Sequence, residues 1–187
     1  MIPDVALVDN TEQRTPLVLV LDCSGSMMGP PVQQLNEDWC DAMDFTAPVL
    51  EADGTTPTGR AIDLALTEVE NEKQRFKAAG IAYTRPWLFL MSDGVPTDTW
   101  EASAKRARDA EQANKVAIFP IAVGDGSQVG VMGQFSSKGE GGVKRLQGLQ
   151  FRELFLWLSA SMQVVSQSRP GGQAQLPSTD TWSSVPT

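Results

Sequence analysis

The sequence predicts a single α/β domain with a Rossmann-like, mostly parallel sheet and helices on both faces. Short apolar runs alternate along the chain with longer segments in which apolar residues recur at helical spacing. The connections between these segments are short, which favours a parallel sheet covered by helices. The length of 187 residues is enough for one hydrophobic core but hardly for two.

The first elements follow from local patterns. Leu17–Leu21 is fully apolar and contains β-branched residues, which predicts a strand buried on both faces. Pro30 is expected to open a helix, because proline is tolerated in the first turn. Thr56 and Pro57 are expected to cap and start the next helix, which Gly80 ends.

The remaining elements continue the alternation. Apolar runs at 86–91 and 116–123 predict two further buried strands. An alanine-rich helix is expected between them, over 99–114, and an amphipathic helix over 151–165 ends the domain. The glycines near residue 140 follow no predicted strand and read as a flexible surface loop.

The domain is expected to span residues 1–166. From 167 to 187 the composition turns to serine, proline, glycine, threonine and glutamine, which predicts a linker or docking tail with little structure of its own. Trp182 in this tail is interpreted either as a second contact for a partner or as a stray residue of a disordered end.

Composition limits the partners and the compartment. The net charge is −8 and no concentrated basic patch occurs, which argues against nucleic acid and against an electrostatic membrane anchor. No apolar stretch approaches the roughly 18 residues that cross a bilayer, and the N-terminus lacks the pattern of a secretion signal. The two cysteines form no C-x-x-C pair, so we expect a cytoplasmic protein.

Polar residues follow two predicted strands. Asp22 ends the first strand, with Ser24 and Ser26 two and four residues later, and Asp93 ends the second. The carboxyl ends of parallel strands meet at one sheet edge, and alternate side chains of an extended loop point the same way. Thr56 adds a fifth oxygen at the start of the next helix. Two carboxylates and three hydroxyls, completed by water, make a six-oxygen site of the kind that Mg²⁺ prefers.

Two features weigh on this interpretation. The sequence contains no histidine, which removes Ser-His-Asp and Cys-His catalysis and histidine zinc sites. A cation would therefore be held by oxygen, as Mg²⁺, Mn²⁺ or Ca²⁺ are, or by two cysteines at most. The alternative is a polar turn, because Asp and Ser often only cap backbone N–H groups. For Asp93-Gly94 alone the turn is favoured, whereas the combination of motifs favours the metal.

The motifs D-C-S-G-S-M, G-T-T-P-T-G and M-S-D-G resemble the metal-ion-dependent adhesion site of von Willebrand factor A (VWA) domains. The similarity is closer to bacterial TerY-like proteins of tellurite-resistance and stress clusters. It extends through GIAYTRPWLFLMSDGVPTD, LQGLQFRELFLWLSASMQVVSQS and the tail, so it covers nearly the whole chain. The resemblance implies that the hydroxyls coordinate directly and that at least one carboxylate acts through water. The residues that it places around a divalent cation are Asp22, Ser24, Ser26, Thr56 and Asp93. Thr55 and Thr58 stay alternatives to Thr56, which is preferred because it is expected to cap the helix.

This resemblance implies a non-enzymatic adaptor that captures an Asp or Glu of a partner protein through the cation. A protein kinase and a PPM-type phosphatase are the partners that it suggests. The alternative is a phosphatase of the haloacid-dehalogenase type with Asp22 as the nucleophile. That class needs a second acid two residues later as general acid/base, where this chain has Ser24.

The chain departs from the family between the first helix and the threonine loop. Family members usually have a longer segment there, with an extra pair of strands, whereas only residues 41–53 remain and show no strand pattern. An uncovered edge or face of the first strand invites pairing. We expect that the N-terminal VALV segment (5–8), a partner chain or self-association covers it.

Overall fold

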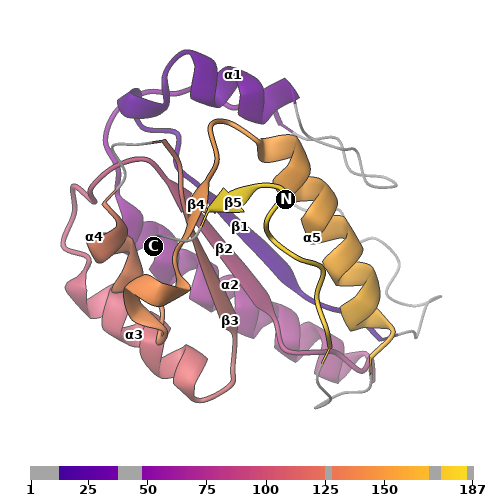
Figure 1. The fold of residues 1–187 in the computed structure, drawn as a ribbon. Helices are drawn as coiled ribbons and strands as arrows, with labels where there is room; N and C mark the ends of the chain where they lie inside the picture. Colours follow the sequence, from indigo (N-terminus) through magenta and orange to yellow (C-terminus); the bar gives the residue numbers. More distant parts are fainter. Residues whose placement is uncertain (1–12, 38–47, 125–127, 169–173, 185–187) are drawn as a thin grey trace.

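The structure, a computed structural model, describes residues 13–37, 48–124, 128–168 and 174–184 (Figure 1). Its sheet has five strands in the order β1-β2-β3-β4-β5, of which the first four are parallel and the last is antiparallel. The strands are β1 (Leu17–Leu21), β2 (Trp87–Ser92), β3 (Ala117–Ala122), β4 (Lys144–Leu146) and β5 (Ser183–Ser184). The predicted mostly parallel, Rossmann-like sheet is confirmed.

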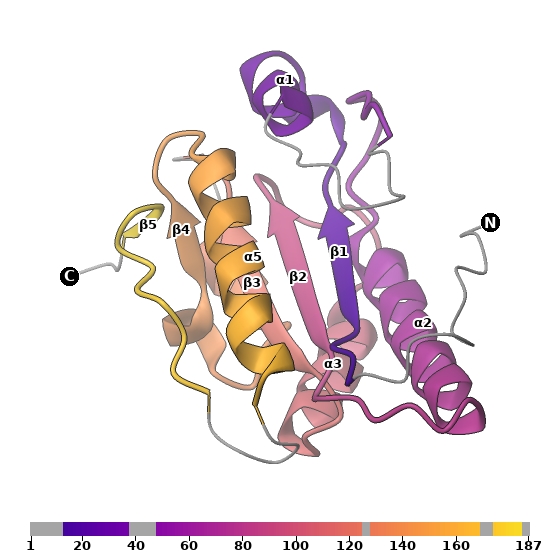
Figure 2. The same cartoon turned by 90° about the vertical axis from the view of Figure 1, so that its right-hand side faces the viewer.

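Helices cover both faces of this sheet, also as predicted. Figure 2 shows α5 on one face, with α2 and α3 on the other. The helices are α1 (Pro30–Glu37), α2 (Thr58–Ala78), α3 (Glu101–Gln112), α4 (Val129–Gly133) and α5 (Phe151–Ser166), with 3-10 turns η1 (Gly25–Met27) and η2 (Gly139–Gly142). Within the described residues, no helix is both long and apolar enough to cross a membrane.

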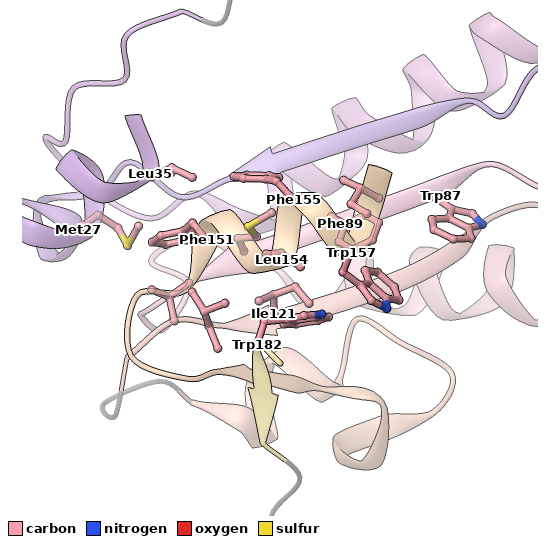
Figure 3. Packing of buried hydrophobic residues seen from close by; sticks show 14 of the residues in the cluster. Met27, Leu35, Trp87, Phe89, Ile121, Phe151, Leu154, Phe155, Trp157 and Trp182 are labelled. Carbon is pink, nitrogen blue, oxygen red and sulfur yellow. The ribbon is translucent and has the colours of Figure 1, made fainter. Parts of the chain in front are cut away.

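Strand β2 shows how the two layers arise. All six of its residues are buried. Trp87, Phe89 and Met91 belong to the apolar cluster under α5, and Figure 3 shows Trp87 and Phe89 beside Trp157 of that helix. Leu88 and Leu90 belong to the cluster under α2 and α3. Because successive side chains of a strand point to opposite faces, a central strand covered on both sides reads as a continuous apolar run.

Strand β1 is less buried than its sequence predicts. It lies at the edge of the sheet (Figure 2), Leu17 is 37% exposed and the other four residues are partly buried. Sheet order is the reason, since residues 48–57 form no strand that could pair with its outer side. The VALV segment and residues 38–47 lie outside the described residues. Coverage of this edge therefore stays a prediction.

The tail returns along α5 after that helix ends at Ser166. The ring centroid of Trp182 lies 5.3 Å from that of Trp157 (Figure 3). The Nε1 of Trp157 donates a 2.9 Å hydrogen bond to the carbonyl of Pro177. β5 then pairs with β4. Trp182 is only 1% exposed, so it serves the core and is not free to contact a partner.

The segment before β4 forms a defined turn at the surface, where its glycines predict a flexible surface loop. Residues 139–142 form the turn η2, which leads directly into β4. A Cβ atom at Gly133 would lie 2.7 Å from the Glu140 nitrogen, and one at Gly142 would lie 2.7 Å from Lys138 Cβ. Gly133 therefore allows close approach of the Glu140 backbone, and Gly142 that of the Lys138 side chain, which composition alone does not predict.

Candidate metal centre

The candidate site begins where β1 and β2 end side by side. Leu21 pairs with Met91 in register, and the next residue, Asp22, donates its N–H to the Met91 carbonyl at 2.9 Å. Asp93 follows β2 by one residue. Parallel pairing therefore brings both acids to one sheet edge, as the sequence predicts.

The two serines of the first loop connect these strand ends. Ser24 Oγ lies 3.0 Å from Ser26 Oγ, and Ser26 Oγ donates a 2.7 Å hydrogen bond to Asp93 Oδ1. Ser24 is only 3% exposed, whereas Ser26 is exposed. A continuous chain of oxygens thus runs from the first loop to the end of β2.

Thr56 faces the same space from a third segment. A Cβ atom at Gly94 would lie 3.7 Å from Ser26 Oγ and 3.8 Å from Thr56 Oγ1. Both hydroxyls therefore lie beside Gly94, and glycine leaves the room between them open. The structure places near one another the five oxygen-bearing residues that the sequence singles out, from three segments of the chain.

Thr56 is not the helix cap that the sequence predicts. Helix α2 begins at Thr58, and the residue before it makes no capping hydrogen bond through a side chain. The cap comes from another segment, because the Asp98 carboxylate accepts hydrogen bonds from the N–H groups of Gly59 and Arg60 at 3.1 and 2.9 Å. The Thr56 hydroxyl faces Gly94 instead.

Thr97 holds the threonine loop in place. Its hydroxyl accepts a 3.0 Å hydrogen bond from the Thr56 N–H, and its own N–H donates to the Thr56 carbonyl at 2.9 Å. Sequence reasoning missed both Thr97 and Asp98. The signal was a pair of polar residues just after the Asp93-Gly94 turn, of a kind that often caps backbone groups.

Asp22 is held by two donors. Its Oδ1 accepts a 2.9 Å hydrogen bond from the Ser24 N–H, and its Oδ2 accepts one of 2.5 Å from Ser92 Oγ. Ser92 was also missed. Because side chains alternate along a strand, Val18, Val20 and Asp22 point to the same face of the sheet. Ser92 points to that face as well, because it continues the alternation of the β2 residues that pair with Val18 and Val20. The side chains of Asp22 and Ser92 therefore meet there.

Cys23 lies inside the first loop but offers no thiolate. Burial and, secondarily, the neighbouring Asp22 carboxylate raise the pKa of the Cys23 thiol, so the group is neutral at pH 7. Within the described part of the chain, no three acidic or cysteine side chains gather into a metal-binding cluster. A cation in this region would depend on hydroxyl oxygens as well as carboxylates.

The loops border a cavity of about 300 Å³. Its lining includes Asp22, Ser24, Thr56 and the adjacent Thr55. A donor set of two carboxylates and three hydroxyls, without thiolate or imidazole, fits a hard divalent cation. Ser26 and Asp93 do not line this cavity; their hydrogen bond, and that between Ser26 and Ser24, connect them to it.

Comparison with known proteins adds little to this picture. No protein-family profile matches the chain, and no curated protein is significantly similar in sequence. Among solved structures, the chain is similar to the Plasmodium vivax TRAP protein in its manganese-loaded crystal structure. The identity is 17% and the TM-score 0.48, over 76% of this chain and 72% of that one. A likeness this distant carries no argument about the site, so the donor assignment depends on the residues and their geometry.

Proposed function

We propose that this chain is a VWA-type, metal-dependent protein interaction module without enzymatic activity. One observation carries the proposal. Ser24, Ser26 and Asp93 form a hydrogen-bonded chain of side-chain oxygens, and Thr56 faces the same space from a separate loop. A polar turn would need only local bonds to its own backbone, whereas the Ser26–Asp93 bond joins segments 67 residues apart in the sequence.

The cation is proposed to be divalent, with Mg²⁺ preferred and Mn²⁺ or Ca²⁺ as alternatives. The residues that would hold it are Asp22, Ser24, Ser26, Thr56 and Asp93. When bound, such an ion supplies a Lewis-acidic position for an oxygen ligand of another molecule. The site has few anionic groups of its own, so a partner's carboxylate is an appropriate ligand.

The proposed partner is a protein that presents an Asp or Glu side chain. The resemblance to TerY-like proteins supports a cytoplasmic role in a bacterial stress, tellurite-resistance or defence-type system, with a protein kinase or PPM-type phosphatase as the partner. Binding to the kinase or to the phosphatase should require the bound cation.

A pull-down with the purified chain and the candidate kinase or phosphatase tests this role. We expect capture in Mg²⁺ that is lost in excess chelator and in Asp93→Ala. Asp109→Ala is the matched control, because Asp109 is an exposed acid paired with Lys105 on α3. Capture that is indifferent to chelator and to Asp93→Ala would place the interface elsewhere.

The phosphatase alternative gains no support from the geometry. The residue two positions after Asp22 is Ser24, whose hydroxyl lies within hydrogen-bonding distance of Ser26 Oγ, and a hydroxyl is a poor proton donor at neutral pH. We expect no hydrolysis of p-nitrophenyl phosphate in Mg²⁺. Activity that copurifies with the chain and disappears in Asp22→Asn would instead identify a phosphatase.

A further inference from the structure

We propose that Ser92 is a positioning residue that fixes the Asp22 carboxylate for cation binding, an inference that rests on the proposed function. Ser92 is the last residue of β2 and is only 3% exposed. The other five residues of this strand are apolar, so its hydroxyl is the polar exception in a buried strand. Buried hydroxyls need a partner, and here that partner is a carboxylate of the candidate site.

The hydrogen bonds around Ser92 define where its proton points. The N–H of Gly94 donates to Ser92 Oγ at 3.2 Å, which occupies one acceptor position of the hydroxyl. Two oxygens are available to receive the Ser92 proton, Asp22 Oδ2 at 2.5 Å and the Gly94 carbonyl at 3.5 Å. The closer, charged acceptor is the stronger one, so Ser92 donates to Asp22.

This bond complements the one on the other carboxylate oxygen. Asp22 Oδ1 accepts from the Ser24 N–H, so the two oxygens are held by donors from two different segments. Two simultaneous bonds fix the rotation of the carboxylate, which a single bond would leave free. The Ser92 bond also ties the first loop to the end of β2, where Asp93 follows.

A carboxylate held in this way loses little conformational freedom when it binds a cation or a cation-bound water. Hydrogen-bonding partners that orient the ligands of protein metal sites typically contribute about 10- to 100-fold in metal affinity. We therefore expect Ser92→Ala to weaken cation binding by about tenfold or more.

The test is calorimetric titration of Mn²⁺ into the full chain. Ser92→Ala should bind about tenfold more weakly than the unaltered chain, and Ser92→Thr, which keeps the hydroxyl, should bind near normally. Ser103→Ala is the matched control. Ser103 is 4% exposed and donates a 2.7 Å hydrogen bond to Asp63 on α2, so the variant loses the same kind of bond outside the donor set.

A second readout needs no metal. Amide exchange of Ser24 should accelerate in metal-free Ser92→Ala, because Asp22 becomes free to turn away from the Ser24 N–H. Should Ser92→Ala fail to fold, Ser92→Thr and Ser92→Val form a pair of equal size that differs in the hydroxyl. The valine variant should then bind Mn²⁺ about tenfold more weakly than the threonine variant.

The outcomes separate this inference from the proposed function. If the unaltered chain binds Mn²⁺ and Ser92→Ala (or Ser92→Val in the pair) binds equally well, Ser92 is not a positioning residue and the metal site stands. If the unaltered chain binds no Mn²⁺, the proposed function fails and this inference fails with it.

Discussion

Two carboxylates, those of Glu111 and Asp93, lie at opposite ends of the sheet and differ in their burial and in the hydrogen bonds that they accept. Glu111 lies beside the start of β3, is 4% exposed and accepts four hydrogen bonds. Asp93 lies beyond the end of β2, is partly exposed and, among the described residues, accepts one hydrogen bond, from the hydroxyl of Ser26. A buried carboxylate whose lone pairs are filled by protein donors holds structure together, whereas one with free lone pairs can accept a ligand.

The donors on Glu111 show what it holds. They are the N–H of Ile118 on β3, the hydroxyl of Ser136, and the N–H and hydroxyl of Ser137, so this side chain joins α3, β3 and the segment after α4. Burial raises the pKa of Glu111, but the hydrogen bonds from Ile118, Ser137 and Ser136 outweigh it and lower the pKa below its ordinary 4.5. Glu111 is therefore ionised, and protein donors bind both of its carboxylate oxygens.

Removing each carboxylate gives the largest contrast. Glu111→Ala should lower the free energy of unfolding by about 3 kcal/mol, because it leaves buried donors without an acceptor. Asp93→Ala, measured in chelator, should change that free energy by less than about 1 kcal/mol. Urea denaturation measures both. Equal losses would mean that Asp93 is as structural as Glu111.

Lowering the pH should lower the free energy of unfolding through protonation of Glu111. Because the folded pKa lies below 4.5, ionised Glu111 stabilises the fold fully above about pH 4.5. This contribution is lost as the pH falls through the folded pKa. Urea midpoints measured between pH 7 and pH 3 should therefore fall less in Glu111→Gln than in the unaltered chain. Identical pH profiles would contradict the assigned role of Glu111.

Substitution of Asp98 should have a smaller effect on the free energy of unfolding and should also affect the candidate metal site. It caps α2 from outside the helix, so Asp98→Ala should cost about 1 kcal/mol. Its neighbour Thr97 holds Thr56, so the variant should also weaken cation binding. Glu101→Ala, which removes an exposed acid in the first turn of α3, is the control for removing an acid nearby. A variant that loses stability and binds the cation normally would show that the two loops are independent.

Sequence predicts the parts of this molecule that depend on local pattern or on strand direction. Asp22 and Asp93 were expected at one sheet edge because parallel strands end there, and both directly follow strands that pair in register. The longer elements also follow from local pattern, such as α2, which is followed by Gly80 at φ +68°. Thr56 was preferred as a ligand because it was expected to cap α2, and that reason is wrong, since Asp98 caps the helix from a different loop.

What sequence misses depends on register and on partners distant along the chain. Ser92 reaches Asp22 only because β1 and β2 pair in a particular register. β4 and β5 have three and two residues and form where the chain returns to the sheet, too short for a periodic signal. The exposure of β1 and the burial of Trp182 depend likewise on strand order and on the docked tail.

The melting temperature of the chain with and without Mg²⁺ tests the central claim, that these oxygens hold a divalent cation, most directly. A ligand that binds only the native state stabilises it, by about 2.7 kcal/mol at one hundred times its Kd. We predict that saturating Mg²⁺ raises the melting temperature and that Asp22→Ala with Ser24→Ala abolishes the rise. A chain that melts at the same temperature with and without Mg²⁺ and Mn²⁺, or a double variant that still responds fully, would contradict the account.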